Sequence, residues 1–245
     1  IFGDSFLVLK IVPVFTYSIS SYLIIIFVKK LFNNIPLAIC CGLTFFLLPS
    51  VSLSSFLLST DILLILLWIC GLIQLLRIKE NPSYLNFIIL GILLGLTFLT
   101  KYAAIYFIIS LILLFIIEKN YRLVFLQSKL KLFISFLIVI LILLPNILWN
   151  YQNDWLTIDH TANNASLDNI KLNPLGFLEF LLSQIVMIGP VLFIGFLLYS
   201  YKQIKIGPNE KFLICFAIPA LLIVSIESLL VRAHANWAAV SFVSL

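Results

Sequence analysis

The sequence predicts an all-α, polytopic membrane protein with about eight transmembrane helices and the start of a ninth. Hydrophobic residues make up 63% of the 245 positions and charged residues only 10%, whereas a soluble domain carries roughly a quarter charged residues. The mean hydropathy is +1.20. Apolar runs of about 15 to 26 residues recur along the whole chain, near the roughly 20 that a helix needs to cross a bilayer.

The helices follow from these apolar runs and from the short polar breaks between them. Pro49 lies inside the second run, where proline removes a backbone donor, so the serine-rich stretch 49–55 is expected to break the helix as a re-entrant elbow. The expected helices span 11–28, 36–57, 62–77, 85–100, 103–117, 132–148, 175–200 and 212–230, and the last begins near Trp237.

The distribution of lysine and arginine predicts the orientation, because cytoplasmic loops carry the excess of both. Threading the helices alternately gives eleven basic residues on one side and four on the other. The eleven are Lys29, Lys30, Arg77, Lys79, Lys119, Arg122, Lys129, Lys131, Lys202, Lys205 and Lys211, and the four are Lys10, Lys101, Lys171 and Arg232. The first side is predicted to be cytoplasmic, and 149–174 is predicted to be an extracytoplasmic loop. The net charge of +5 then reflects membrane orientation and gives no case for nucleic acid.

A single transmembrane domain, 1–245, accounts for the whole chain. It begins with Ile1 and stops at Leu245 inside an expected helix, so we expect an internal fragment of a longer protein. Four cysteines, Cys40, Cys41, Cys70 and Cys215, fall within expected spans without metal-binding spacing, which favours packing roles and predicts no metal site.

The external side gathers the chemically varied side chains, and each of them has a structural alternative. Asp61 opens an expected helix, where a carboxylate favours the N-terminus. Lys101 ends another, where the helix dipole favours a cation and the long stem can snorkel to the interface. The functional alternative is that Lys101, held in a very short turn beside Tyr102, binds an anionic ligand at the outer interface.

Three further features of the sequence are polar or small residues within or beside the apolar runs. The stretch 149–169 holds Asp159 and His160 close to Trp155, which fits either a binding loop or a solvated connection with interfacial tryptophans. Gly91 and Gly95 form a small-xxx-small face that predicts close helix packing. Glu179 and Glu227 lie near the outer ends of their spans and are not placed in the site.

Five blocks in order resemble a known family. They are GDSFLVLKIVP at 3–13, LLSTDILLILLW at 57–68, GILLGLTFLTKYAA at 91–104, PNILWNYQNDWLTIDH at 145–160 and RAHANWAA at 232–239. Together they resemble the polyprenyl-phosphate-sugar-dependent glycosyltransferases related to protein O-mannosyltransferases and to the lipid A aminoarabinose transferase. The resemblance implies a C-type glycosyltransferase fold in the bacterial inner membrane, which transfers a sugar from a polyprenyl-phosphate donor to a lipid, glycan or protein acceptor on the extracytoplasmic face.

The resemblance also implies site residues. Lys101 matches the lysine of an LTK motif and Asp61 the aspartate of a TxD-like pair. Lys10 stands where the family has arginine, so that position keeps the charge without a bidentate grip on phosphate. The implied phosphate-binding residues are Lys101, Lys10, Tyr102 and His160, and further candidates are Asp61, Asp159, Arg232 and His234.

Several points stay open at this stage. Family members usually carry an aspartate in the first external loop, upstream of the aligned region, so no catalytic residue is assigned. Relatives differ in their use of a divalent metal, and the cofactor is therefore unknown. A polytopic transporter and a non-catalytic membrane scaffold are the alternative functions. The transporter is disfavoured because it would more often show paired ionisable residues at mid-membrane and matched halves.

Overall fold

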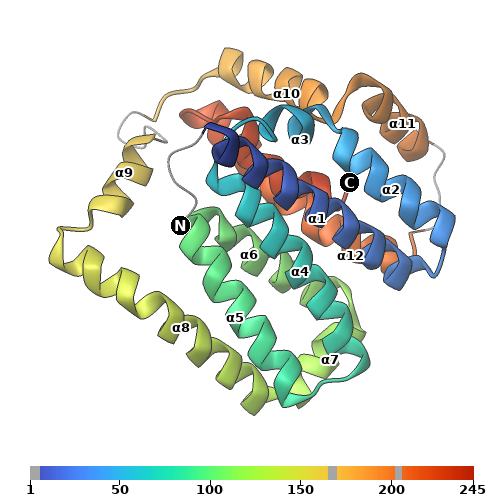
Figure 1. The fold of residues 1–245 in the computed structure, drawn as a ribbon, viewed down its shortest axis with the longest axis vertical. Helices are drawn as coiled ribbons and strands as arrows, with labels where there is room; N and C mark the ends of the chain where they lie inside the picture. Colours follow the sequence, from blue (N-terminus) through green and yellow to red (C-terminus); the bar gives the residue numbers. More distant parts are fainter. Residues whose placement is uncertain (1–5, 165–169, 202–205) are drawn as a thin grey trace.

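The computed structural model describes residues 6–164, 170–201 and 206–245, and these form a bundle of helices (Figure 1). The elements are α1 (Phe6–Phe32), α2 (Ile35–Leu47), α3 (Pro49–Ser54), α4 (Thr60–Glu80), α5 (Tyr84–Thr100), the 3₁₀ turn η1 (Tyr102–Ala104), α6 (Ile105–Ile117), α7 (Lys119–Gln127), α8 (Lys129–Gln152), α9 (Leu156–Asn164), α10 (Pro174–Ile188), α11 (Pro190–Tyr201), α12 (Pro208–Leu230) and η2 (Ala235–Val243). The described part of the chain holds no strand, so the predicted all-α class is confirmed.

The predicted number of spans is confirmed only in part. Within the described residues, four helices, α1, α4, α8 and α12, are long and apolar enough to cross a membrane, or five if the pair 102–117 and 119–127, bent by 107°, is counted as one. Shorter apolar helices run over Ile35–Leu47, Tyr84–Thr100 and Pro174–Ile188. The count of eight and the start of a ninth is therefore not confirmed.

Two expected helices are broken for local reasons. The run 36–57 splits at Leu48, whose extended backbone (φ −53°, ψ 134°) is what the residue before Pro49 prefers. The expected break at Pro49 is thus confirmed. The run 175–200 splits at Gly189, whose φ of 93° is a conformation that side-chain-bearing residues rarely adopt. The expected last helix near Trp237 is the 3₁₀ segment η2.

Two segments expected to be loops contain helices. The connection after 117, predicted to be cytoplasmic, forms α7, which buries Tyr121 and Phe125, one helical turn apart, against the bundle. The predicted loop 149–174 holds the end of α8 and all of α9, while residues 165–169 lie outside the described part. Neither helix is apolar enough to stand out by composition, which explains why both were missed.

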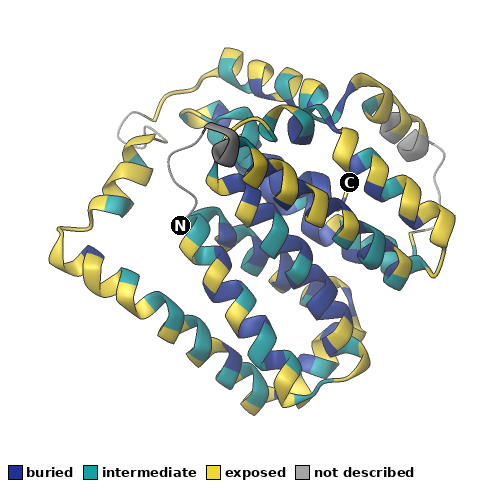
Figure 2. Ribbon diagram, in the orientation of Figure 1, coloured by how far each residue is buried: buried dark blue, intermediate teal, exposed yellow. Residues whose placement is uncertain are grey.

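Helix α4 forms the centre of the bundle, with 72% of its most apolar window buried, whereas α8 on the edge has only 6% buried (Figure 2). Trp68 of α4 packs edge-on against Phe107 of α6 at a centroid distance of 5.0 Å, and Phe107 meets Phe216 of α12 at 5.0 Å. The outer faces of α1, α5 and α8 expose large apolar side chains. Such faces suit lipid, as expected for an integral membrane protein.

The small-residue face of α5 packs against α8, as predicted. A Cβ atom at Gly91 would lie 2.6 Å from the carbonyl oxygen of Ser135, and one at Gly95 would lie 2.9 Å from Ile142 Cβ. Glycine therefore allows the two backbones to approach closely, in the manner of small-xxx-small contacts in membranes. This contact attaches the otherwise exposed α8 to the bundle.

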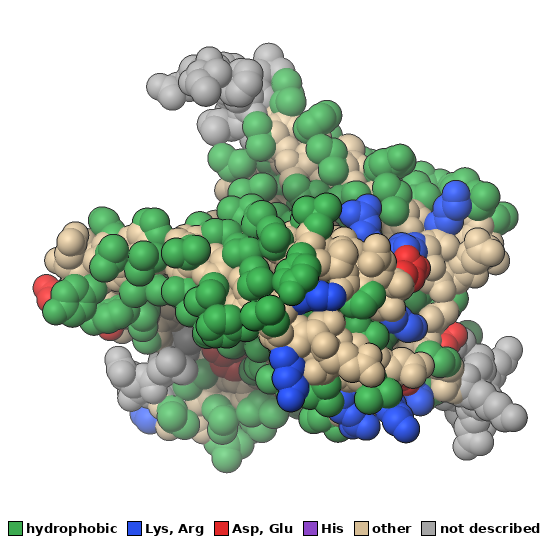
Figure 3. All heavy atoms as spheres, turned by 90° about the horizontal axis from the view of Figure 1, so that it is seen from below, with side chains coloured by type: hydrophobic (Ala, Val, Ile, Leu, Met, Phe, Trp, Pro, Cys, Tyr) green, Lys and Arg blue, Asp and Glu red, His purple; other side chains and the backbone are tan. Residues whose placement is uncertain are grey.

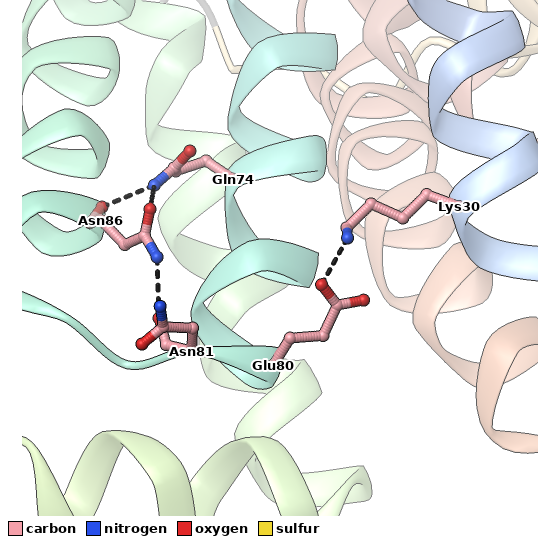
Figure 4. A network of polar contacts seen from close by, with 5 residues as sticks. All are labelled: Lys30, Gln74, Glu80, Asn81 and Asn86. Carbon is pink, nitrogen blue, oxygen red and sulfur yellow. Dashed lines mark hydrogen bonds and ion pairs between the residues drawn. The ribbon is translucent and has the colours of Figure 1, made fainter.

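The basic ends of the helices meet at one end of the bundle. Lys30 of α1 forms an ion pair with Glu80 of α4, and the buried Gln74 donates to the backbone and side-chain oxygens of Asn86 at 2.8 and 3.1 Å (Figure 4). Lys211 pairs with Glu118 at 3.3 Å at the same end. In Figure 3, most of the lysine and arginine side chains gather in the right-hand half of the visible face.

The opposite end of α4 carries Asp61, which contacts Lys101. The structure thus keeps described members of the two predicted charge groups at opposite ends of the helices. Lys202 and Lys205, which the prediction placed with the basic group, lie outside the described residues. Which end faces the cytoplasm stays a prediction.

Candidate functional site

Asp61 joins three elements that are far apart in the sequence. It lies in the first turn of α4, and its residue surface is only 7% exposed. Its Oδ1 accepts a hydrogen bond from Lys101 Nζ at 2.7 Å, and its Oδ2 accepts one from Asn236 Nδ2 at 2.6 Å. The helix N-terminus favours a carboxylate here, but both oxygens are directed at other elements, so a capping role alone does not account for the contacts.

Lys101 stands between α5 and η1 in an extended conformation, with φ −165° and ψ 137°. Its side chain is 26% exposed and its ammonium is turned toward Asp61. An ammonium has three N–H donors, and among the described residues Asp61 is the one acceptor found for it. Asp61 therefore fixes the ammonium of Lys101, and two of its three N–H donors are left for a ligand.

Tyr102, next to Lys101, connects the pair to the segment predicted as an external loop. Its hydroxyl lies 2.9 Å from Thr157 Oγ1 in α9, and Thr157 is hydrogen-bonded in turn to Asn150 of α8. Asp159 and His160 also lie on α9, but both are exposed. The structure places α9 beside Tyr102 without showing a contact from Asp159 or His160 to Lys101.

The segment after α12 brings Arg232 and His234 toward the same end. Arg232 is exposed, and the half-buried ring of His234 packs against Trp237 at a centroid distance of 5.2 Å. Partial burial lowers the pKa of His234, and the positive charges of Arg232 and Lys101 lower it further. His234 is therefore within electrostatic reach of Lys101 and is disfavoured as a second cation.

Lys10 is the predicted phosphate-binding residue that lies on α1. It lies half-buried near the start of α1, and the hydrogen bonds described for Asp61 and Lys101 join them to each other and to Asn236. Among the predicted residues, direct contact thus joins Asp61 and Lys101, while Tyr102 and His234 lie nearby. The roles assigned to all eight stay predictions.

The sequence reasoning missed Asn236. Its amide completes the shell of Asp61, although 175 positions separate the two residues. The only signal was its place in the RAHANW block, where arginine and histidine drew attention as charged or titratable groups. The serines of α3 were missed as well: Ser50 and Ser54 line a cavity of about 10 Å³ that also touches Asp61 and Asn236.

The described residues contain no group of three or more histidine, cysteine, aspartate or glutamate side chains that could hold a metal ion. Each oxygen of Asp61 accepts one hydrogen bond from a nitrogen donor, and we assign no metal site there.

Comparison with known proteins gives a family. The family model described as dolichyl-phosphate-mannose-protein mannosyltransferase matches residues 1–149. The lipid A galacturonosyltransferase RgtD of Rhizobium johnstonii is 29% identical over 209 residues, which cover 83% of this chain and 42% of the relative, so the chain spans about two fifths of that protein's length. No solved structure matches the chain significantly. Because the family model covers more than half of the chain, the protein belongs to the dolichyl-phosphate-mannose-protein mannosyltransferase family of membrane glycosyltransferases.

Proposed function

We propose that the protein is part of an integral-membrane glycosyltransferase that moves a sugar from a polyprenyl-phosphate donor to an acceptor on the extracytoplasmic face of a bacterial inner membrane. Family membership supports the reaction class. The relative's name specifies galacturonosyl transfer to lipid A, and for this chain the sugar and the acceptor stay unassigned. The single observation that carries the proposal is the Asp61–Lys101 pair, held at the end of the bundle opposite the basic one.

In this proposal Lys101 binds the donor's phosphate. Asp61, whose other oxygen accepts from Asn236, holds the ammonium, and two N–H donors remain for the phosphate oxygens. Because the side chain of Lys101 is 26% exposed and that of Asp61 only 10%, the cation is the more accessible of the two to a phosphate. Tyr102 sits beside Lys101 and anchors α9, so it is placed to close the site from the loop side.

The transfer step explains why a fixed cation is useful. The bond between the anomeric carbon and the phosphate oxygen breaks, its electron pair stays on the phosphate, and the acceptor oxygen forms the new glycosidic bond. The acceptor's proton passes to a base that we do not assign among the described residues. Negative charge therefore grows on the phosphate, and a preoriented ammonium stabilises it without reorganising.

We also propose that the short and broken helices cross the membrane, which would give about eight spans and the start of a ninth. The 17 residues of α5 make a helix about 25 Å long, slightly less than the roughly 30 Å hydrocarbon core. Local thinning of the bilayer or snorkelling of flanking residues accommodates such a difference at small cost.

The proposal is tested with Lys101 variants of the full-length enzyme in membranes, by measuring sugar transfer from a polyprenyl-phosphate donor alongside expression. Lys101→Ala should lower turnover roughly 100-fold or more, as for removal of a donor from a preorganised anion site. Lys101→Arg should retain part of the activity because the charge survives. Lys171→Ala, which removes an exposed lysine predicted to face the same side, is the matched control and should be close to wild type. Wild-type turnover in Lys101→Ala would remove Lys101 from the mechanism.

A further inference from the structure

A second cavity is lined in part by the segment that leads to Asn236. It has a volume of about 300 Å³ and opens between the first half of α10 and the segment 231–235 that follows α12. We call it the outer groove. Its volume is at the lower end for small-molecule sites. Its polar lining consists of Asn173, Glu179, Ser183, Ser228, Arg232 and His234.

Hydrogen bonds from both sides fix the walls of the outer groove. The backbone N–H of Lys171 donates to Leu230 O at 2.9 Å, and that of Asn173 donates to Leu229 O at 2.7 Å. On the other side, the buried Gln184 of α10 donates from Nε2 to Ala235 O at 3.2 Å. The groove is therefore preformed by contacts between α10 and the end of α12.

The neutral polar side chains in the groove keep hydrogen-bonding capacity. Asn173 Oδ1 accepts from Gly176 N at 2.9 Å, which leaves the amide N–H₂ group as a donor. A Cβ atom at Gly176 would lie 2.3 Å from that nitrogen, so glycine is needed for the amide to sit there. The hydroxyls of Ser183 and the buried Ser228 donate to backbone carbonyls at 2.6 and 2.7 Å. Ser183 Oγ also accepts from Gln184 Nε2 at 3.2 Å, which leaves one lone pair on that oxygen as an acceptor.

The groove also carries one acidic and one basic side chain, which do not form an ion pair with each other. Glu179 and Arg232 are exposed, and within residues 6–164, 170–201 and 206–245 no ion pair or hydrogen bond engages either side chain. A carboxylate accepts from hydroxyls, and a guanidinium grips phosphate or carboxylate oxygens. Donors, acceptors and one anion-binding group together fit a sugar that bears a negative charge.

The outer groove and the proposed phosphate site are connected by the segment 232–236. Arg232 and His234 face the groove, while Asn236, two residues further, holds Asp61. The charge of Lys101 also reaches His234, since it contributes to the lowered pKa of that ring. In a direct transfer, the acceptor hydroxyl must lie beside the donor's phosphate-bearing carbon, so an acceptor site is needed at this position.

We propose that the outer groove binds the acceptor, and that the acceptor is a sugar carrying a phosphate or a carboxylate, which Arg232 holds while Glu179 and the Ser183 oxygen bind its hydroxyls. This inference rests on the proposed function, because it assigns the second substrate of the same site. It also assigns a role to Glu179, which the sequence alone did not place in a site.

Cysteine protection tests the proposal in the purified full-length enzyme. The Ser183→Cys variant is labelled with a membrane-impermeant maleimide, and the labelling of the unmodified protein by its native cysteines is subtracted. Three probes are added separately: glucose 1-phosphate, glucuronic acid and the uncharged methyl glucoside. With a dissociation constant of about 1 mM, usual for ligands of this size, about 5 mM of a charged probe should slow labelling roughly sixfold.

The controls separate the groove from other effects. Methyl glucoside should protect less than the charged probes, and Arg232→Gln should remove that difference. The stronger of the two charged probes identifies phosphate or carboxylate as the preferred group. Asn164→Cys, exposed on α9 outside the groove lining, should be labelled at one rate with and without every probe. Equal labelling of Ser183→Cys under all conditions, or equal protection at Asn164→Cys, would overturn the inference.

The same variants, combined with Lys101→Ala, distinguish this inference from the proposed function. Lys101→Ala should lose transfer in the otherwise native enzyme and should keep protection when combined with Ser183→Cys, because Lys101 does not line the groove. Lost transfer without protection in the parent variant would contradict the acceptor groove and leave the phosphate role standing. Protection together with wild-type transfer in Lys101→Ala would contradict the phosphate role and leave the groove as a sugar site.

Discussion

The Asp61–Lys101 contact should behave as a coupled pair in a double-mutant cycle. Asp61→Asn keeps the shape of the side chain and removes its charge, and Lys101→Gln removes the partner's charge. At the observed 2.7 Å, the gross attraction is about 6 kcal/mol for an effective dielectric constant of about 20. Desolvation of both groups offsets much of this. Since 26% of the Lys101 side chain is exposed, water partly replaces the lost partner.

The expected coupling is therefore about 1.5 to 3 kcal/mol, the range for hydrogen bonds that involve charged groups. Apparent melting temperatures of the two single variants, the double variant and the wild type, measured in detergent, give this value. Each single change should lower the melting temperature by about 5 °C, and the double change should cost clearly less than the sum. Asp159→Asn, at an exposed carboxylate on α9, is the control and should stay within about 0.5 kcal/mol of wild type. Costs that add to within about 0.5 kcal/mol would refute the coupling.

Three further predictions concern packing, orientation and pH. Gly95→Leu should lower the melting temperature by several degrees, because a Cβ there would lie 2.9 Å from Ile142 Cβ; Gly195→Leu, with nothing within 4 Å, should have little effect. Asn164→Cys should react with an impermeant thiol reagent added to intact cells, and labelling only after permeabilisation would reverse the orientation. Because the pKa of His234 is lowered on folding, its contribution to stability is complete above pH ~6.5 and is lost as the pH falls through the lower folded value. His234→Gln should therefore reduce the loss of melting temperature on acidification, and an unchanged loss would contradict this.

The fold class could be predicted because it depends on averages over long stretches. High hydrophobicity with few charges admits few alternatives to a helical membrane protein. The division of the basic residues between the two ends of the helices is likewise a property of the whole chain. The close contact of α5 with α8 could also be predicted, since glycines at a spacing of four lie on one face of a helix. Gly91 and Gly95 are both at that contact.

The breaks and the unexpected helices depend on single residues and on tertiary packing. Gly189 ends α10 through a positive φ that no apolar average reveals. The nine residues of α7 are too polar to register as a span, and its helix is supported by Tyr121 and Phe125 packing on the bundle. Sequence patterns of this kind predict long apolar helices well and short interfacial ones poorly.

The candidate site could also be predicted only in part from the sequence. Asp61 and Lys101 could be selected because charge is rare beside such apolar runs, but their mutual contact spans 40 positions. Asn236 could not be selected, since a neutral amide carries no such signal until the fold brings it to Asp61. The outer groove likewise arises from two segments that meet only in the folded chain.

The most direct test of the central claim is the binding of a polyprenyl phosphate, without sugar, to the purified full-length protein. Native mass spectrometry of wild type and of Lys101→Gln at matched lipid concentrations measures the occupancy of the site without requiring turnover. The ammonium at Lys101 is held by Asp61 at 2.7 Å, and the side chain is 26% exposed, so two N–H donors are left for a ligand. Wild type should therefore bind the lipid about tenfold more tightly than Lys101→Gln, because one charge-assisted hydrogen bond contributes roughly 1.5 to 3 kcal/mol. Equal affinity of the two proteins would contradict the assignment of Lys101 to the donor's phosphate.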